Sequence, residues 1–272
     1  MPKDDLTVAI AGLGAIGATV ARQLDAGRVA GLRLSALAGR DRSKSEQFTA
    51  TLECNPALVP LDHLADHADI VVECLPSSVF DQVAIPAVDA GRILVVLSAG
   101  ALLERADLIA QADITGARII VPSGAILGLD AICAAAEGRI DSVTIVTRKP
   151  PKGLLGAAYL DDNGIDISNL SKPLCVFEGP VREAARHFPA NVNVAAAISL
   201  AGIGADRTCV EVWADPGLER NTHAVSVVSD SANFTMTIEG LPTDENPRTG
   251  RITPQSVIAT LRRLTAPLVI GT

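Results

Sequence analysis

Two groups of residues in this sequence have the types and spacing that chemistry requires. The first is a glycine triplet, Gly12-x-Gly14-x-x-Gly17, within VAIAGLGAIGATVARQL. The second is His223, which faces the same way as Val225 and Val227 in the alternating segment THAVSVV. A histidine in that setting is either a hydrogen-bonded core residue or a group of near-neutral pKa that works as a general acid–base.

The glycine triplet lies between the apolar run LTVAIAG and the helical pattern AIGATVARQLDAG. Glycines in a strand-to-helix turn allow a tight turn, a close approach to a pyrophosphate and close packing of helix on strand. The helix N-terminus then offers N–H groups to the phosphates. Glycine-rich turns also serve packing alone, but the flanking pattern favours dinucleotide binding. The expected pyrophosphate contacts are Gly12, Gly14, Ala15, Ile16 and Gly17.

A charged segment, GRDRSK, follows the second apolar run. Asp41 stands where an acid would accept hydrogen bonds from the ribose hydroxyls of NAD. Arg40, with Arg42, could instead bind the 2′-phosphate of NADP. A solvated turn with self-paired charges is the alternative, so the sequence leaves NAD and NADP both open.

Small residues follow three later apolar runs, in CLPSS, SAGAL and PSGAI. Ligands of open parallel sheets lie over the carboxyl ends of the strands. Turns of this kind leave room for a flat nicotinamide ring against the backbone. The residues expected there are Leu75, Pro76, Ala99 and Gly100.

The order of strand and helix patterns predicts two domains. Strands apolar on both faces alternate with helices in the first part, which indicates a Rossmann-type, doubly wound parallel sheet. After LGLDAICAAAEG, alternating strands such as DSVTIVTRK and THAVSVVSD predict an α+β domain with a largely antiparallel sheet. The tail TPQSVIATLRRLTAPLVIG predicts a helix and a short strand that return to the first domain. We therefore expect a dinucleotide-binding domain of residues 1–124 plus 246–272, and a catalytic and dimerisation domain of residues 125–245.

Composition excludes several classes of function. The net charge of −8 and the 3% of aromatic residues do not favour a nucleic-acid surface. No apolar run is long enough for a membrane span, and the N-terminus lacks a signal-peptide pattern, so we expect a cytoplasmic protein. The five scattered cysteines fit neither disulfides nor zinc. His63 and His67 lie among acidic residues on a solvated face, and we expect no metal site.

Four further segments carry a resemblance to a known family: PSGAILGLD, KPPKG, FPANVNVAAA and ADPGLERNTH. Together with the glycine motif, they resemble the L-aspartate dehydrogenase family in order and spacing over essentially the whole chain. The resemblance implies oxidation of L-aspartate by NAD or NADP to iminoaspartate, which hydrolyses reversibly to oxaloacetate and ammonia. In some bacteria iminoaspartate then feeds NAD synthesis.

The resemblance also implies roles for particular residues. The catalytic histidine of the family falls on His223, and its nicotinamide contacts fall on Ala125 and on an asparagine of FPANVNV. Asn193 is the first choice for that asparagine and Asn191 the second, although both could simply cap a helix.

The two carboxylates of the substrate need cationic or N–H partners. Lys152 is one candidate because two prolines stiffen the approach to it, and Arg248 is a weaker one. Ser123 of PSGA is a further candidate. Asp215, in the turn before the strand, could orient the His223 ring.

The sequence leaves two alternatives open. One is another two-domain reductase, similar to dihydrodipicolinate reductase or homoserine dehydrogenase. The other is a dinucleotide-binding regulator without activity. An open sheet that pairs to bury its face also favours a homodimer.

Overall fold

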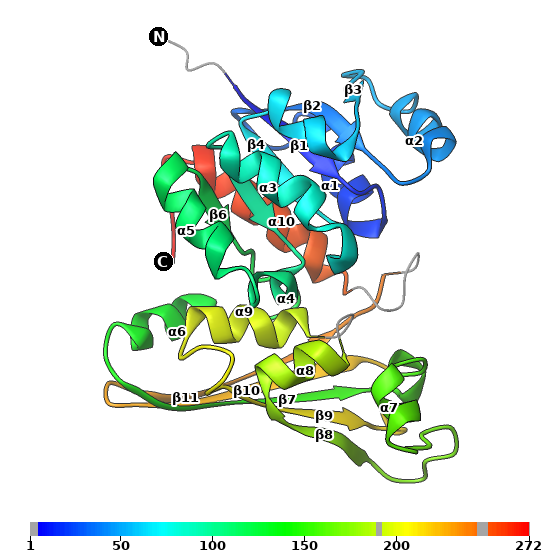
Figure 1. Cartoon of the computed structure of the whole chain (residues 1–272), viewed down its shortest axis with the longest axis vertical. Helices are drawn as coiled ribbons and strands as arrows, with labels where there is room; N and C mark the ends of the chain where they lie inside the picture. The colour runs from blue at the N-terminus through cyan, green and yellow to red at the C-terminus, as the bar shows by residue number, and fades with distance from the viewer. Residues whose placement is uncertain (1–4, 189–191, 244–249, 272) are drawn as a thin grey trace. The chain divides into compact units, whose positions relative to one another are not determined.

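The computed structural model describes residues 5–188, 192–243 and 250–271. The chain forms two compact units (Figure 1): Met1–Gly124 with Thr253–Ile270, and Ala125–Ile252 with Gly271–Thr272. Each unit has a sheet of its own, of six and of five strands.

The sheet of the first unit is parallel throughout, with strand order β3-β2-β1-β4-β5-β6. Its strands are β1 (Leu6–Ala11), β2 (Leu32–Ala38), β3 (Ala57–Leu58), β4 (Ile70–Glu73), β5 (Ile93–Val96) and β6 (Arg118–Ile120). Strand order reverses between β1 and β4, so the carboxyl ends of these two strands form the crevice where ligands bind in such sheets. The predicted doubly wound parallel sheet is confirmed.

Helices cover both faces of this sheet because the central strands are apolar on both faces. On one face, Val71 and Leu94 pack with Val83 and Leu108. On the other, Val8 and Ile10 pack with residues of the first and last helices, including Val20 and Val257. The helices are α1 (Ala15–Asp25), α2 (Arg42–Thr49), α3 (Asp81–Asp89), α4 (Ala99–Leu102), α5 (Ala106–Thr115) and α10 (Ile252–Thr265), with short 3₁₀ turns η1 (Leu61–Asp66) and η2 (Ser77–Val79).

The second unit is built on a mixed sheet of order β11-β10-β7-β9-β8. Its strands are β7 (Ile140–Lys149), β8 (Leu174–Pro180), β9 (Cys209–Ala214), β10 (Asn221–Ser229) and β11 (Asn233–Gly240). Only β7 and β9 run parallel, and the other neighbours are antiparallel. The predicted α+β domain with a largely antiparallel sheet is thus confirmed.

Helices of this unit lie on one face of its sheet (Figure 1): α6 (Leu129–Ala136), α8 (Val181–His187) and α9 (Asn193–Ala201). The remaining helical pieces are η3 (Pro151–Gly153) and α7 (Ala158–Asp162). Along β7 the residues Val143, Ile145, Thr147 and Lys149 are buried, and the residues between them are more exposed. This alternation identifies the covered face, and β10 follows it with His223, Val225 and Val227.

Two local expectations were wrong or incomplete. No strand follows α10 in the described part of the tail, where Leu268 and Ile270 are largely exposed. An apolar run this short, directly after Pro267, does not pair with either sheet. The GRDRSK segment is more than a turn, because Arg42 begins helix α2. None of the helices that the structure describes is long and apolar enough to cross a membrane.

Candidate active site

The glycine triplet forms the connection from β1 to α1. Gly12 has a φ of +96°, and a Cβ there would lie 2.5 Å from the carbonyl oxygen of Cys74. A Cβ on Gly17 would lie 1.9 Å from the carbonyl oxygen of Gly12. Any side chain at either position would therefore force apart β1, β4 and α1.

Gly14 differs from the other two glycines because a Cβ there would meet no heavy atom within 4 Å. It is the N-cap of α1, and no side chain caps the helix. No side chain therefore blocks a ligand from approaching the first N–H groups of α1 beside Gly14. This geometry fits a pyrophosphate at the helix N-terminus.

A buried carboxylate, Glu73, joins the two turns that follow β4 and β5. Its side chain has no exposed surface. Oε1 accepts from the backbone N of Leu75 at 2.7 Å, and Oε2 accepts from the backbone N of Leu97 at 3.2 Å and of Ser98 at 2.9 Å. The Ser98 hydroxyl lies 3.0 Å from Oε1 and 2.6 Å from the carbonyl oxygen of Leu75.

This network fixes the backbone on which a nicotinamide is expected to rest, since Leu75–Pro76 and Ala99–Gly100 directly follow these turns. Burial raises the pKa of the Glu73 carboxyl, while the hydrogen bonds from Ser98, Leu75 and Leu97 oppose that rise. A carboxylate in a short buried strand needs such donors, because an unpaired buried charge is very costly.

Charged residues gather after β2. Asp41 is the N-cap of α2, and its Oδ1 accepts from the backbone N of Lys44 at 3.1 Å. Arg42 bonds Glu46 one helical turn later, with Nε to Oε1 at 2.9 Å. Arg40 is exposed.

His223 of the second unit is buried, with 5% of its surface exposed. In the register of β10 and β7 it lies opposite Thr147. Its Nδ1 is 3.0 Å from Oγ1 of Thr147, which is itself buried. The ring is thus held from one nitrogen by a hydroxyl group on the neighbouring strand.

The imidazole of His223 is neutral at physiological pH. Burial and then the positive charge of Lys149 lower its pKa to about 3. Lys149 lies two residues beyond Thr147 on the same covered face of β7, about 7 Å along the strand, and is itself buried. A neutral imidazole has a nitrogen lone pair with which to accept a proton.

The sequence singled out other polar residues near this position. The Asp215 carboxylate accepts from the backbone N of Gly217 at 2.9 Å and lies 3.5 Å from Arg148. The hydrogen-bond partner of the His223 ring is therefore Thr147, which has the role that the sequence suggested for Asp215. Lys152, in the η3 turn, is exposed, unlike the buried Lys149.

The remaining predicted contacts fall in three places. Ser123 and Ala125 flank Gly124, whose backbone N donates to Oγ of Ser256 at 3.0 Å. Asn193 is the first residue of α9. Asn191 and Arg248 lie outside the described residues.

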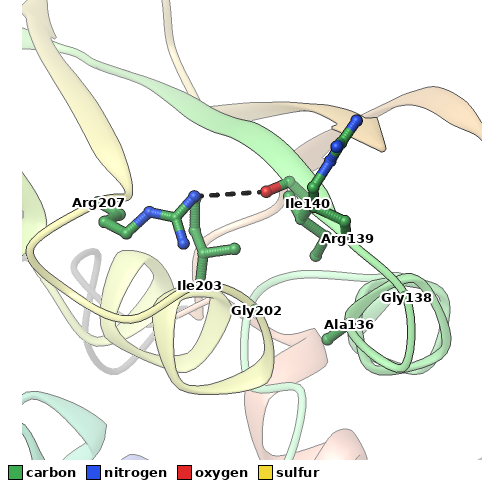
Figure 2. A pocket seen from close by; sticks show the side chains of 7 residues that line it. All are labelled: Ala136, Gly138, Arg139, Ile140, Gly202, Ile203 and Arg207. Carbon is green, nitrogen blue, oxygen red and sulfur yellow. Dashed lines mark hydrogen bonds between the residues drawn. The ribbon is translucent and has the colours of Figure 1, made fainter. Parts of the chain in front are cut away.

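A separate hollow of about 380 Å³ lies in the second unit (Figure 2). It is lined by Ala136, Gly138, Arg139, Ile140, Gly202, Ile203 and Arg207. Ile140 is seven residues from Thr147 on β7, a separation of about 23 Å at ~3.3 Å per residue. The hollow is therefore distinct from the surroundings of His223.

The described residues contain no group of three or more His, Cys, Asp or Glu side chains placed to hold a metal ion. His63 instead contacts Asp66, with Nδ1 and Oδ2 3.0 Å apart on the exposed η1 turn.

Comparison with known proteins identifies the family. Residues 130–264 match a family model described as aspartate dehydrogenase, C-terminal, and residues 12–122 match the homoserine dehydrogenase NAD binding domain. L-Aspartate dehydrogenase 3 of Bordetella bronchiseptica is 54% identical over 270 residues, which cover 99% of each chain. The chain belongs to the L-aspartate dehydrogenase family. The predicted resemblance is confirmed, and with it an NAD(P)-dependent oxidoreductase acting on a CH–NH₂ group.

Other members of the L-aspartate dehydrogenase family agree over the same length. The L-aspartate dehydrogenase of Bradyrhizobium diazoefficiens is 53% identical over 98% of this chain and 95% of its own. The crystal structure of aspartate dehydrogenase from Thermotoga maritima matches with a TM-score of 0.72 at 26% identity, over 98% of this chain and 99% of its own. A homoserine dehydrogenase from Thiobacillus denitrificans, at 16% identity and a TM-score of 0.61, shares the fold.

Proposed function

We propose that this chain catalyses the oxidative deamination of L-aspartate with NAD or NADP, through iminoaspartate to oxaloacetate and ammonia, with His223 as its acid–base residue. Membership of the L-aspartate dehydrogenase family supports the activity. The neutral, buried imidazole held by Thr147 supports the role of His223. The coenzyme, when bound, supplies the acceptor for the hydride from Cα of the substrate.

The first unit supplies most of the coenzyme contacts in this proposal. Gly12, Gly14, Ala15, Ile16 and Gly17 hold the pyrophosphate, because the first turn of α1 is open there. The ribose side of the adenosine lies at Arg40 and Asp41. The nicotinamide rests on the two turns that Glu73 joins, and its contacts are Leu75, Pro76, Ala99, Gly100, Ala125 and Asn193, with Asn191 as the second choice of asparagine.

His223 moves protons at the substrate. Loss of hydride from Cα turns the amine into an imine, and the amine must give up a proton in doing so. The neutral imidazole takes this proton, releases it to solvent, and then takes a proton from the water that adds to the imine carbon. When Nδ1–H donates to Oγ1 of Thr147, Nε2 is the basic nitrogen.

Lys149 is the cation best placed to bind a substrate carboxylate beside His223. It is buried on the same face of β7 as Thr147, and its charge already acts on the imidazole. Lys152, Arg248 and Ser123 are the further candidates, and Lys152 provides a solvent-exposed comparison from the same KPPK segment.

An assay that follows coenzyme reduction tests the function. L-Aspartate is offered with NAD and with NADP, beside L-homoserine and L-glutamate as competing substrates. We expect reduction with L-aspartate and formation of oxaloacetate and ammonia. Turnover of L-homoserine alone, or coenzyme binding without turnover of any substrate, would contradict the proposal.

Replacing Lys149 tests the substrate site. Lys149→Met keeps much of the aliphatic volume but removes the charge, and a lost charge-assisted hydrogen bond costs about 1.5–3 kcal/mol. We expect KM for L-aspartate to rise about 10- to 100-fold. Steady-state kinetics at saturating coenzyme measure this change. Lys152→Met is the matched control, for which we expect a change below about 5-fold. Equal effects of the two substitutions would refute the assignment.

The same substitution has a consequence for pH. Removing the positive charge of Lys149 raises the pKa of His223 from about 3. The imidazole then protonates at a higher pH, so the fall of kcat/KM on acidification begins at a higher pH in Lys149→Met than in the unsubstituted protein. An unchanged acid limb would show that Lys149 does not act on the imidazole.

We also propose that the chain forms a homodimer through the sheet of the second unit. Helices α6, α8 and α9 share one face of that sheet (Figure 1). Val146, Trp213 and Ala224 are half-buried on the other face, and Val146 lies opposite Ala224 in the register. A second copy would bury this face in a two-fold interface.

The five free cysteines fit a reducing compartment, which supports the cytoplasm as the location of the protein.

A charge at the centre of that face tests the dimer. We expect Val146→Lys to convert dimers to monomers, because an unpaired charge is costly inside an interface. Light scattering after size-exclusion chromatography gives the mass. Ile114→Lys, at an exposed position of α5, is the control and should leave the mass unchanged. A monomeric unsubstituted protein would refute the proposal.

A further inference from the structure

We infer that the coenzyme site selects NADP over NAD, with the guanidinium of Arg40 binding the 2′-phosphate. The inference rests on the proposed coenzyme site and adds its selectivity. It is supported by the fact that three neighbouring charged residues, Arg40, Asp41 and Arg42, differ in the contacts that their side chains make.

Backbone contacts bring the segment after β2 to the glycine loop. The backbone N of Gly12 donates to the carbonyl oxygen of Ala38 at 2.8 Å, so the last residue of β2 lies beside the first glycine. A Cβ on Gly39 would lie 3.4 Å from a methyl group of Leu13 and 2.3 Å from Oγ of Ser45. Gly39 is therefore confined between the glycine loop and α2, and Arg40 follows it directly.

Asp41 is engaged in the structure of its own helix. Oδ1 of Asp41 accepts from the backbone N of Lys44, and its carbonyl oxygen accepts from the Ser45 hydroxyl at 2.7 Å. These bonds account for an acid at the N-cap of α2. A coenzyme site selective for NAD needs an acid directed at the ribose hydroxyls, and one oxygen of this carboxylate already accepts a hydrogen bond from the helix.

Arg40 and Arg42 differ in a way that separates their roles. Arg42 is held by Glu46 at 2.9 Å. The exposed Arg40 guanidinium contacts no acidic or hydrogen-bonding partner among the described residues. Its planar set of donors suits a phosphate, which it can bind through two parallel hydrogen bonds.

The local charge also favours an anion. Residues 40–46 hold Arg40, Arg42 and Lys44 against Asp41 and Glu46, which gives three positive and two negative charges, or +1. The chain as a whole has a net charge of −8. A positive segment on an acidic protein attracts the negatively charged 2′-phosphate of NADP. The 2′-hydroxyl of NAD is neutral and gains no such attraction.

Calorimetric titration of the full chain with NADP and with NAD tests the inference without any need for turnover. We expect tighter binding of NADP. Arg40→Ala should weaken NADP binding about 10- to 100-fold, the effect of losing a charge-assisted hydrogen bond to phosphate, and change NAD binding by less than about 5-fold. Arg42→Ala, which removes an arginine already paired with Glu46, is the matched control and should change both by less than about 5-fold.

Two results would overturn the inference. One is binding of NAD as tight as that of NADP by the unsubstituted protein, and the other is equal weakening of both nucleotides by Arg40→Ala. Either leaves the L-aspartate dehydrogenase activity in place, because both coenzymes carry the same nicotinamide. Failure to bind either nucleotide would instead overturn the coenzyme site and this inference together.

Discussion

Replacement of His223 by alanine is expected to lower kcat for L-aspartate oxidation by about 10²- to 10⁴-fold, the usual contribution of one general acid–base residue. Its buried imidazole is neutral at physiological pH because burial and the charge of Lys149 lower its pKa, and a ring nitrogen of the neutral form can accept a proton from the amine or the water. Coenzyme affinity should remain nearly unchanged, because the proposed coenzyme residues with the strongest structural support belong to the other unit. Stopped-flow measurement of coenzyme reduction and nucleotide titration measure the two effects separately.

Two further variants show whether the loss at His223 is chemical. His67→Ala, at an exposed histidine that follows η1, should retain full activity. Thr147→Val removes the hydroxyl that holds Nδ1 but keeps the β-branched shape, and should lower kcat more than it changes KM. Full activity of His223→Ala would remove this residue from the mechanism.

Replacement of Glu73 by alanine is expected to have the largest effect on stability. It leaves the backbone N–H groups of Leu75 and Ser98 without their side-chain acceptor, whereas the N–H of Leu97 keeps its bond to the carbonyl oxygen of residue 73 at 3.3 Å. Each unsatisfied group costs about 1–3 kcal/mol. The sum for two groups, about 2–6 kcal/mol, is a large part of the free energy of unfolding of an ordinary domain, about 5–15 kcal/mol. We expect Glu73→Ala to fail to fold or to lose coenzyme binding.

Glu73→Gln gives a folded protein in which the same network can be measured. One amide oxygen replaces two carboxylate oxygens, and the amide NH₂ faces N–H donors, so we expect a loss of about 1–3 kcal/mol and weaker coenzyme binding. Urea unfolding and titration with reduced coenzyme measure these changes, and Glu53→Gln, at an exposed glutamate, is the control. Unchanged unfolding and binding would show that the turns after β4 and β5 do not depend on this side chain.

The pH dependence of stability has a defined sign at Glu73. Burial raises its pKa in the folded protein. The protonated carboxyl therefore contributes stability at low pH, and this contribution is lost as the pH rises through the raised pKa. Glu73→Gln cannot ionise, so its free energy of unfolding should lack this loss.

Sequence patterns predicted the features that depend on local periodicity. The spacing of Gly12, Gly14 and Gly17 between a strand and a helix identified the β1–α1 turn. The alternation of His223, Val225 and Val227 placed the imidazole on the covered face of β10, where it is buried. The same alternation along β7 places Lys149 on the buried face.

Features that depend on pairing of distant segments were not predicted. Thr147 contacts His223 across 76 positions of sequence, because the register of β7 and β10 brings them together. Glu73 was not predicted as a structural residue, although an acid at a buried strand end already indicates nearby donors. The N-cap role of Asp41 becomes visible only once α2 is known.

Transfer of deuterium from Cα of L-[2-²H]aspartate to the coenzyme tests the central claim most directly. We expect the purified protein to form labelled reduced coenzyme together with oxaloacetate and ammonia, and His223→Ala to bind the coenzyme but transfer almost no label. Label transfer by His223→Ala at the rate of the unsubstituted protein, or none from L-aspartate in either protein, would contradict it.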